Sequence, residues 1–224
     1  NSEANHAHAD SVLNVTIGMD DKEYQAYQEY AAKNDKQEYL GQNKGGTRDE
    51  KLVRDMAVFS AFGEGLQLFA SFVMLLNFQR HGKMKGMGQI VAWSIRDESH
   101  HVESMIKLFH CLLDEKPHVW NDTFKKSLYD ICRDMVTLED RFIDLAFELG
   151  PVEGLEPHEV KQYIRYIADR RLLQLGLKPN FGVKDNPLEW VDWVVNGVEH
   201  TNFFENRSTE YAKGTLQGSW ADAF

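Results

Sequence analysis

The stretch Trp93–His101 limits the possible folds of this chain more than any other. It lies in a helical pattern that starts near Met87 and runs to about Glu115. Within it, Glu98 and His101 are three residues apart, so both side chains project from nearly the same face of a helix. Paired helices with this Glu-x-x-His motif build the di-metal carboxylate sites of helical bundles. The motif alone is weak, because exposed helices contain it by chance, and other residues must support it.

A second helical pattern runs from roughly Asp49 to Arg80 and carries Glu64 in its apolar half. The glycines between residues 81 and 86 predict a turn that joins two antiparallel helices. For a turn near residue 82, Glu64 lies 18 residues before it, and Glu98 and His101 lie 16 and 19 residues after it. At about 1.5 Å per residue, all three reach one level, roughly 27 Å from the turn. They predict half of a site for two transition metal ions, although Glu64 as a lone buried carboxylate is the alternative.

The chain begins with another Glu-x-x-His motif, at Glu3 and His6, just before apolar residues that favour a helix through about residue 16. The two motifs and Glu64 together supply five ligands of a kind that suits Fe or Mn. A complete site of this type needs one more carboxylate from a fourth helix. No acidic residue precedes Glu3, and the sequence does not begin with Met. We therefore expect a fragment, or one half of a split protein.

The rest of the sequence also favours helices, and convincing strand-like alternation is absent from it. Beyond Gly197 the apolar residues lose any period, which predicts a mobile tail over residues 198–224. We predict an all-α protein with one helical domain, residues 1–197, whose aromatic residues Tyr163, Tyr166, Trp190 and Trp193 belong to the core. The further helices are expected at 20–40 on the surface, from Asn121-Asp122 to about Leu149, from Pro157 to Leu175, and at 186–195.

Charge and cysteine content limit the partners and the compartment. The formal net charge of −10 argues against binding to nucleic acids or anionic membranes. The longest uninterrupted apolar run, Phe72–Leu76, is far shorter than the ~20 residues of a membrane span. Cys111 and Cys132 lie in helical patterns without disulfide or metal spacing, which favours a reducing compartment. We expect a cytoplasmic protein.

Several runs of residues resemble one known family. Glu64 stands at this family's distance ahead of its second metal motif, which the run Gly86–His101 matches, and Glu3-x-x-His6 is similar to the first. Further matches are Tyr166–Leu172, Asn186–Trp190 and Asn202–Tyr211. On these residues the chain resembles the radical-generating small (beta) subunit of class I ribonucleotide reductase over nearly its whole length. The family's N-terminal part, with its first Asp ligand and an early Trp, has no counterpart here.

The resemblance implies a fold and a function. The fold is a ferritin-like helical bundle that forms a homodimer. Its two metal ions, Fe/Fe or Mn/Fe, react with oxygen or a reduced oxygen species and store one oxidising equivalent. That equivalent passes to a cysteine of the separate large (alpha) subunit, where ribonucleotides are reduced to deoxyribonucleotides. The chain would then be the beta subunit of a ribonucleoside-diphosphate reductase, an enzyme that is active only with its large subunit.

The resemblance also assigns roles to single residues. Asp97 would accept a hydrogen bond from the ligand His6 and orient it. Glu205 and Tyr211 would lie in the tail, with Tyr211 as the relay at the subunit interface. Trp220 and Phe224 would dock on the large subunit. The ligands would be Glu3, His6, Glu64, Glu98 and His101, whereas His100 diverges from His101 by about 100° around the helix and would point elsewhere.

Asp10 departs from the family pattern. Most members carry the radical-bearing tyrosine four residues after the first motif's His, and this chain has Asp10 there. One helical turn separates it from His6, so Asp10 should point toward the same site. A carboxylate cannot form a phenoxyl radical. Some members without that tyrosine keep the oxidising equivalent on a high-valent metal pair, often Mn with Fe; the alternative is that this copy is degraded or inactive.

Two other functions stay open on the sequence. The chain could be a non-catalytic or split-protein half that only completes a bundle with another polypeptide. It could also be another ferritin-like di-metal oxidase that acts on lipids or small molecules. The segment from Tyr211 to Phe224 argues against this oxidase, because an enzyme that works alone needs no such extension.

Overall fold

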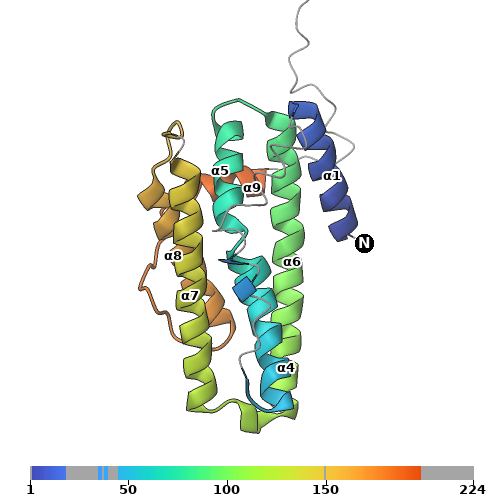
Figure 1. The fold of residues 1–224 in the computed structure, drawn as a ribbon, viewed down its shortest axis with the longest axis vertical. Helices are drawn as coiled ribbons and strands as arrows, with labels where there is room; N and C mark the ends of the chain where they lie inside the picture. The colour runs from blue at the N-terminus through green and yellow to red at the C-terminus, as the bar shows by residue number, and fades with distance from the viewer. Residues whose placement is uncertain (1, 19–34, 37, 40–44, 149, 198–224) are drawn as a thin grey trace, which may run out of the picture.

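The computed structural model describes residues 2–18, 35–36, 38–39, 45–148 and 150–197, without the side chains of residues 2–4, 6, 10, 196 and 197. These residues form a helical bundle whose long members run along one axis (Figure 1). Within the described ranges, the only extended pairing is an isolated bridge between Val152 and Leu155, so the all-α expectation is confirmed. The elements are α1 Ser2–Ile17, α4 Arg48–Ala57, the π-helix η1 Val58–Glu64, α5 Phe69–Arg80, α6 Lys85–Glu115, the 3-10 helix η2 Pro117–Val119, α7 Asp122–Phe147, α8 Pro157–Gln174 and α9 Glu189–Gly197.

The helical stretch expected from Asp49 to Arg80 is present as Arg48–Arg80, but it is not one regular α-helix. Seven residues, Val58–Glu64, form a π-helix between α4 and α5. The N–H of Gly65 donates to the carbonyl of Ser60, and the N–H of Gln67 donates to the carbonyl of Phe62 at 3.1 Å. Both bonds span five residues rather than four. Such π segments occur within helices frequently at functional sites, and this one ends at Glu64.

The antiparallel hairpin of α5 and α6 follows the prediction. Gly82 and Met84 take positive φ angles of 73° and 46° in the connection, which allows the reversal. At Gly88 a Cβ atom would lie 2.6 Å from Cβ of Gln79, so the missing side chain lets α5 approach α6 closely. The buried face of α6 repeats every three or four residues, as an amphipathic helix requires, through Val91, Ile95, Glu98, Val102, Ile106 and Phe109.

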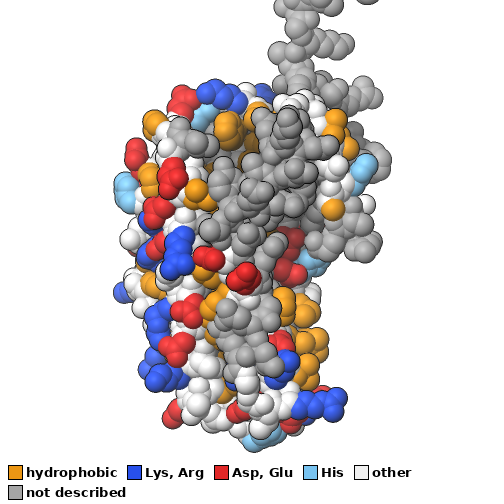
Figure 2. All heavy atoms as spheres, viewed as in Figure 1, with side chains coloured by type: hydrophobic (Ala, Val, Ile, Leu, Met, Phe, Trp, Pro, Cys, Tyr) orange, Lys and Arg blue, Asp and Glu red, His pale blue; other side chains and the backbone are white. Residues whose placement is uncertain are grey.

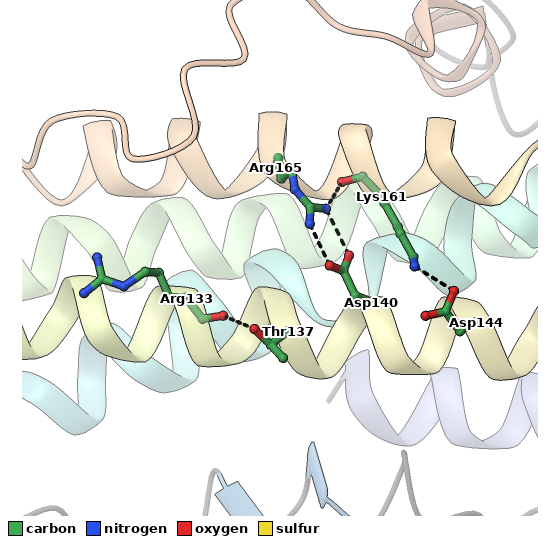
Figure 3. Close-up of polar contacts among 6 residues, drawn as sticks. All are labelled: Arg133, Thr137, Asp140, Asp144, Lys161 and Arg165. Atoms are coloured by element: carbon green, nitrogen blue, oxygen red, sulfur yellow. Dashed lines mark hydrogen bonds and ion pairs between the residues drawn. The ribbon is translucent and has the colours of Figure 1, made fainter.

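The pair of α7 and α8 completes the core. Asn121 caps α7 by accepting a hydrogen bond from the N–H of Phe124 at 2.9 Å. Two hydrogen bonds, at 3.0 and 2.6 Å, join the guanidinium of Arg165 on α8 to the carboxylate of Asp140 on α7 (Figure 3). Lys161 donates to Asp144 at 2.6 Å one turn further along the same seam. These pairs set the register of the two helices.

Core and surface match the sequence patterns with one exception. Tyr163 is 3% exposed and packs in the core, but Trp193 is 75% exposed, so its assignment to the core was wrong. α9 is short and amphipathic, and Trp193 lies on its outer face. The thiols of Cys111 and Cys132 are both free. Most of the surface helix expected over residues 20–40 lies outside the described residues.

The helical stretch Arg48–Arg80 is long and apolar enough to cross a membrane by length and composition. In this structure 56% of its most apolar window is buried inside the molecule. The core helix of a soluble protein passes the same test, and this stretch packs against α6, α7 and α8.

Candidate metal centre

Three predicted ligands meet in the structure. Glu64 comes from the last position of η1, and Glu98 and His101 come from the middle of α6. One ligand atom from each of the three side chains lies within 4.8 Å of the other two. Nδ1 of His101 is 3.5 Å from Oε2 of Glu98. The predicted common level is therefore observed, despite the π-helix that interrupts the first helix.

The local sequence explains how each group reaches this point. Glu98 is only 5% exposed, because it occupies the buried face of α6 between Ile95 and Val102. His101 follows one turn later, and its side chain stays about one third exposed. Glu64 ends the π-helix, where the wider turn changes the direction in which successive side chains point. His100 is exposed, as expected for a residue beside the ligand face.

The first Glu-x-x-His motif lies on α1. This helix packs against α6; in Figure 1 its C-terminal end lies near the start of α6, and the helix slants away from α6 toward the N-terminus. The side chains of Glu3, His6 and Asp10 are outside the described part of the structure, so their roles stay predictions.

Other predicted site residues are less constrained. Asp97 is half-buried on α6 next to Glu98, and its role depends on the side chain of His6. The tail residues Glu205, Tyr211, Trp220 and Phe224 lie outside the described residues.

The cluster fits a transition metal ion. Oxygen and nitrogen ligands lie about 2.0–2.2 Å from such an ion, so donors on opposite sides of it are slightly more than 4 Å apart, and the three ligand atoms here lie within 4.8 Å of one another. Two carboxylates and one imidazole form a donor set of the type that Fe and Mn accept. Two carboxylates brought together in a protein interior repel each other, and a cation between them removes that cost. Glu64, Glu98 and His101 are therefore residues that could hold a metal ion.

The family follows from the whole sequence. Residues 1–187 match the family described as "Ribonucleotide reductase, small chain". The chain belongs to this family. A probable ribonucleoside-diphosphate reductase small subunit of Invertebrate iridescent virus 3 is 45% identical over 97% of this chain and 62% of the viral protein. A second viral relative, a probable small subunit of Invertebrate iridescent virus 6, is 39% identical over 97% of this chain and 71% of its own length.

Bacterial relatives and solved structures agree with this membership. The ribonucleoside-diphosphate reductase subunit beta of Chlamydia pneumoniae is 32% identical over 93% of this chain and 63% of that protein. The ribonucleotide reductase R2 subunit from Clostridium botulinum superposes with a TM-score of 0.77 at 22% identity, over 85% of this chain and 62% of that one. This likeness shows the shared ribonucleotide reductase small-chain fold. The chain spans less than two thirds of the first viral relative and of the chlamydial protein.

The sequence analysis did not identify the charged groups that lie around η1 and the start of α5. Arg171 of α8 reaches the backbone beside Glu64, and Glu139 of α7 is buried against Lys36. One signal was present for Arg171, because it lies four and eight residues after the buried Ile167 and Tyr163 and so shares their helix face. No comparable signal points to Lys36, which is distant in sequence from both helices.

Proposed function

We propose that this chain acts as the small subunit of a class I ribonucleotide reductase. The observation that carries the proposal is the convergence of Glu64, Glu98 and His101 in a chain of this family. The cofactor would be two transition metal ions, Fe/Fe or Mn/Fe, held by these residues together with Glu3 and His6. When bound, the metal pair would react with oxygen or a reduced oxygen species and supply the oxidising equivalent for ribonucleotide reduction.

The protein groups have distinct tasks in this proposal. The carboxylates of Glu64 and Glu98 offset the positive charge of the metals inside the bundle, where an unpaired charge would be unfavourable. His101 supplies a neutral nitrogen donor. Asp97 accepts the outer N–H of His6 and fixes which ring nitrogen faces the metal. Asp10 has no oxidisable ring, so we infer that no tyrosyl radical forms at that position.

The partners follow from the same role. The tail, residues 198–224, would bind the large subunit through Trp220 and Phe224, with Glu205 and Tyr211 on the route to it. Disordered segments that order on binding use such aromatic anchors. We also propose a homodimer in the cytoplasm. In support of a dimer, Leu52 and Phe59 are 46% and 51% exposed on one side of α4 and η1.

A metal-content experiment tests the site. We expect Glu64→Ala and His101→Ala each to lower the metal bound per chain after loading with Mn²⁺ and Fe²⁺, because each removes one of the described donors. Glu103→Ala is the matched control: Glu103 also lies on α6 but is exposed and paired with Lys107 at 3.2 Å. Circular dichroism should show the same helix content in all variants.

The opposite outcome is specific. Two metal ions per chain in both ligand variants would mean that the site lies elsewhere. Metal binding without any turnover in the presence of a large subunit would favour a non-catalytic half of the bundle.

A further inference from the structure

The helical stretch that carries Glu64 changes from π to α geometry directly after this residue and is broken by a turn at Gln67 and Leu68. Gly65 is the C-cap of η1, and α5 begins only at Phe69. The last carbonyl groups of a helix have no partner within that helix and need one from elsewhere. In this structure Nε of Arg171, from α8, donates a hydrogen bond to the carbonyl oxygen of Gly65 at 2.8 Å. A side chain 106 residues away thus binds the peptide group adjacent to a metal ligand.

We propose that Arg171 is a positioning residue for the metal ligand Glu64, acting through the carbonyl of Gly65. The inference rests on the proposed function, because it assumes that Glu64 binds a metal. It adds a group that touches neither the metal nor the Glu64 carboxylate. Its task is to hold the end of the π-helix so that the carboxylate points at Glu98 and His101.

The contact depends on the glycine. A Cβ atom on residue 65 would lie 2.7 Å from Nε and 3.2 Å from Cδ of Arg171, and 3.0 Å from the carbonyl oxygen of Ser60. Real Cβ atoms essentially never lie as close as 2.7 Å to another heavy atom, so the guanidinium would have to shift. The absence of a side chain at Gly65 therefore lets the guanidinium reach the backbone. Glycine and arginine form one matched contact between η1 and α8.

Arg171 is itself held in place. Its Nη1 donates to Oε1 of Gln174 at 2.8 Å, and its guanidinium lies 5.5 Å from the ring centre of Phe69. Burial lowers its pKa to about 10, so the group stays positively charged at neutral pH. A charged donor makes a stronger hydrogen bond than a neutral one, and the planar guanidinium fixes its direction. A cation at the C-terminal end of a helix also complements the helix dipole.

Metal affinity is sensitive to such support. Groups that orient a ligand typically change metal affinity or activity 10–100-fold when they are removed. Arg171 acts on the backbone next to Glu64 rather than on its carboxylate, so we expect the lower end of that range. The change in affinity would be seen in the folded protein and would not require unfolding of the bundle.

The test compares two adjacent arginines on α8. Mn²⁺ alone is titrated into the whole chain, and free Mn²⁺ is measured by electron paramagnetic resonance. Arg171→Met keeps most of the side-chain length but removes the donor, and should weaken Mn²⁺ binding by roughly tenfold. Arg170→Met is the control, because Arg170 is exposed and donates to the hydroxyl of Tyr166 at 2.8 Å; it should change binding by less than about twofold. Arg171→Lys retains one charged donor and should recover part of the affinity.

A double-mutant cycle with Gly65→Ala separates this role from a general loss of stability. Gly65→Ala should displace the guanidinium and weaken Mn²⁺ binding. Adding Arg171→Met to it should weaken binding by no more than about twofold further, because the contact is already lost. All measurements are made well below the thermal unfolding midpoint of each metal-free variant. A purely structural role would lower that midpoint and leave the Mn²⁺ dissociation constant unchanged.

The outcomes are distinguishable. If the wild-type chain binds no Mn²⁺, the proposed metal site is wrong and the inference falls with it. If the wild type binds Mn²⁺ and both Arg171 variants bind it equally well, the positioning role is wrong and the metal site stands. If Arg171→Met does not fold, Arg171→Lys takes its place in the double-mutant cycle with Gly65→Ala. The inference would be overturned if Arg171→Lys bound Mn²⁺ with wild-type affinity and if the fold-changes in the Mn²⁺ dissociation constant caused by the two substitutions simply multiplied in the double variant.

Discussion

Glu139 is the most deeply buried acidic residue of α7, at 0% exposure, and its partner comes from a distant segment. Nζ of Lys36 forms an ion pair with its carboxylate and also donates to the carbonyl of Gln67 at 3.3 Å. The backbone N–H of Ala70, in the first turn of α5, faces the same carboxylate. A negative charge is favourable at a helix N-terminus. Glu139 thus lies at the start of α5, on the opposite side of the Gln67–Leu68 turn from Arg171.

The buried charge predicts a dependence of stability on pH. Burial raises the pKa of Glu139 from 4.5 to about 7, and the positive charge of Lys36 opposes the shift. Between these two values the folded protein holds a proton that the unfolded chain has lost, so this group's contribution to stability falls as the pH rises. The loss amounts to about 3 kcal/mol by pH 7.5, since each pKa unit corresponds to about 1.36 kcal/mol.

Urea unfolding of the metal-free protein measures this effect. Relative to Glu139→Gln, which does not titrate, the wild type should lose free energy of unfolding between pH 4.5 and 7.5. The exposed residue Glu103 supplies the control, because Glu103→Gln should leave the pH dependence of the wild type unchanged. Parallel curves for wild type and Glu139→Gln would show that Glu139 keeps an ordinary pKa.

At the scale of elements, a single carboxylate organises the connection from α8 to α9. Asp169 is 2% exposed on α8. Its Oδ1 accepts hydrogen bonds from the N–H groups of Asn180 and Phe181 at 2.7 and 2.8 Å. Its Oδ2 accepts from the N–H of Val183 at 3.0 Å. A segment without regular secondary structure is thereby fixed against the helix, which keeps its buried backbone groups hydrogen-bonded.

Asp169→Asn should destabilise the protein by about 1–3 kcal/mol. The side-chain oxygen of the introduced asparagine could still accept the hydrogen bonds from the N–H groups of Asn180 and Phe181. The side-chain NH₂ group would then face the N–H of Val183, and two donors would oppose each other. Thermal unfolding followed by circular dichroism measures the loss. Asp185→Asn, at an exposed position of the same connection, should have little effect. An equal midpoint for Asp169→Asn and the wild type would show that the connection does not depend on the second oxygen.

At the scale of the whole molecule, the surface is not uniformly polar. Basic and acidic side chains alternate over the face of α7 and α8, whereas hydrophobic side chains gather at the edge along the lower half of α6 (Figure 2). Exposed large apolar residues lie on α6 and on two elements that pack against it, α4 and η1: they include Leu108 on α6, Leu52 on α4 and Phe59 on η1. Apolar groups clustered on one side mark an interaction surface. They are the structural basis for the proposed homodimer.

The proposed dimer can be tested at this surface. We expect the double variant Leu52→Glu, Phe59→Glu to sediment as a monomer under conditions in which the wild type sediments as a dimer, because buried charge would oppose association. The exposed residue Trp193, on α9, serves as the control, and Trp193→Glu should leave the dimer intact. An unchanged dimer in the double variant would place the interface on another face.

The sequence predicted the features that depend on local spacing. Helix ends were close to those observed, because Asn121, Pro157 and Gly176 act on the residues next to them: α7 begins at Asp122, α8 begins at Pro157, and Gly176 has a φ of 81° after α8. The shared face of Glu98 and His101 follows from the helical period alone. Their approach to Glu64 needed only the lengths of two helices on either side of a turn.

The tertiary structure decided what holds the ligand helix in its irregular form. No local pattern shows that Val58–Glu64 is a π-helix rather than an α-helix, because the two differ by one residue in hydrogen-bond register and share the same composition. Arg171 at Gly65 and Glu139 near Ala70 come from helices more than 60 residues away in sequence, and Lys36, the partner of Glu139, comes from a segment 31 residues before Gln67. The helical period of the sequence predicts which face of its helix a residue occupies. Only the packing of α7 and α8 against that face determines which charge meets which backbone group.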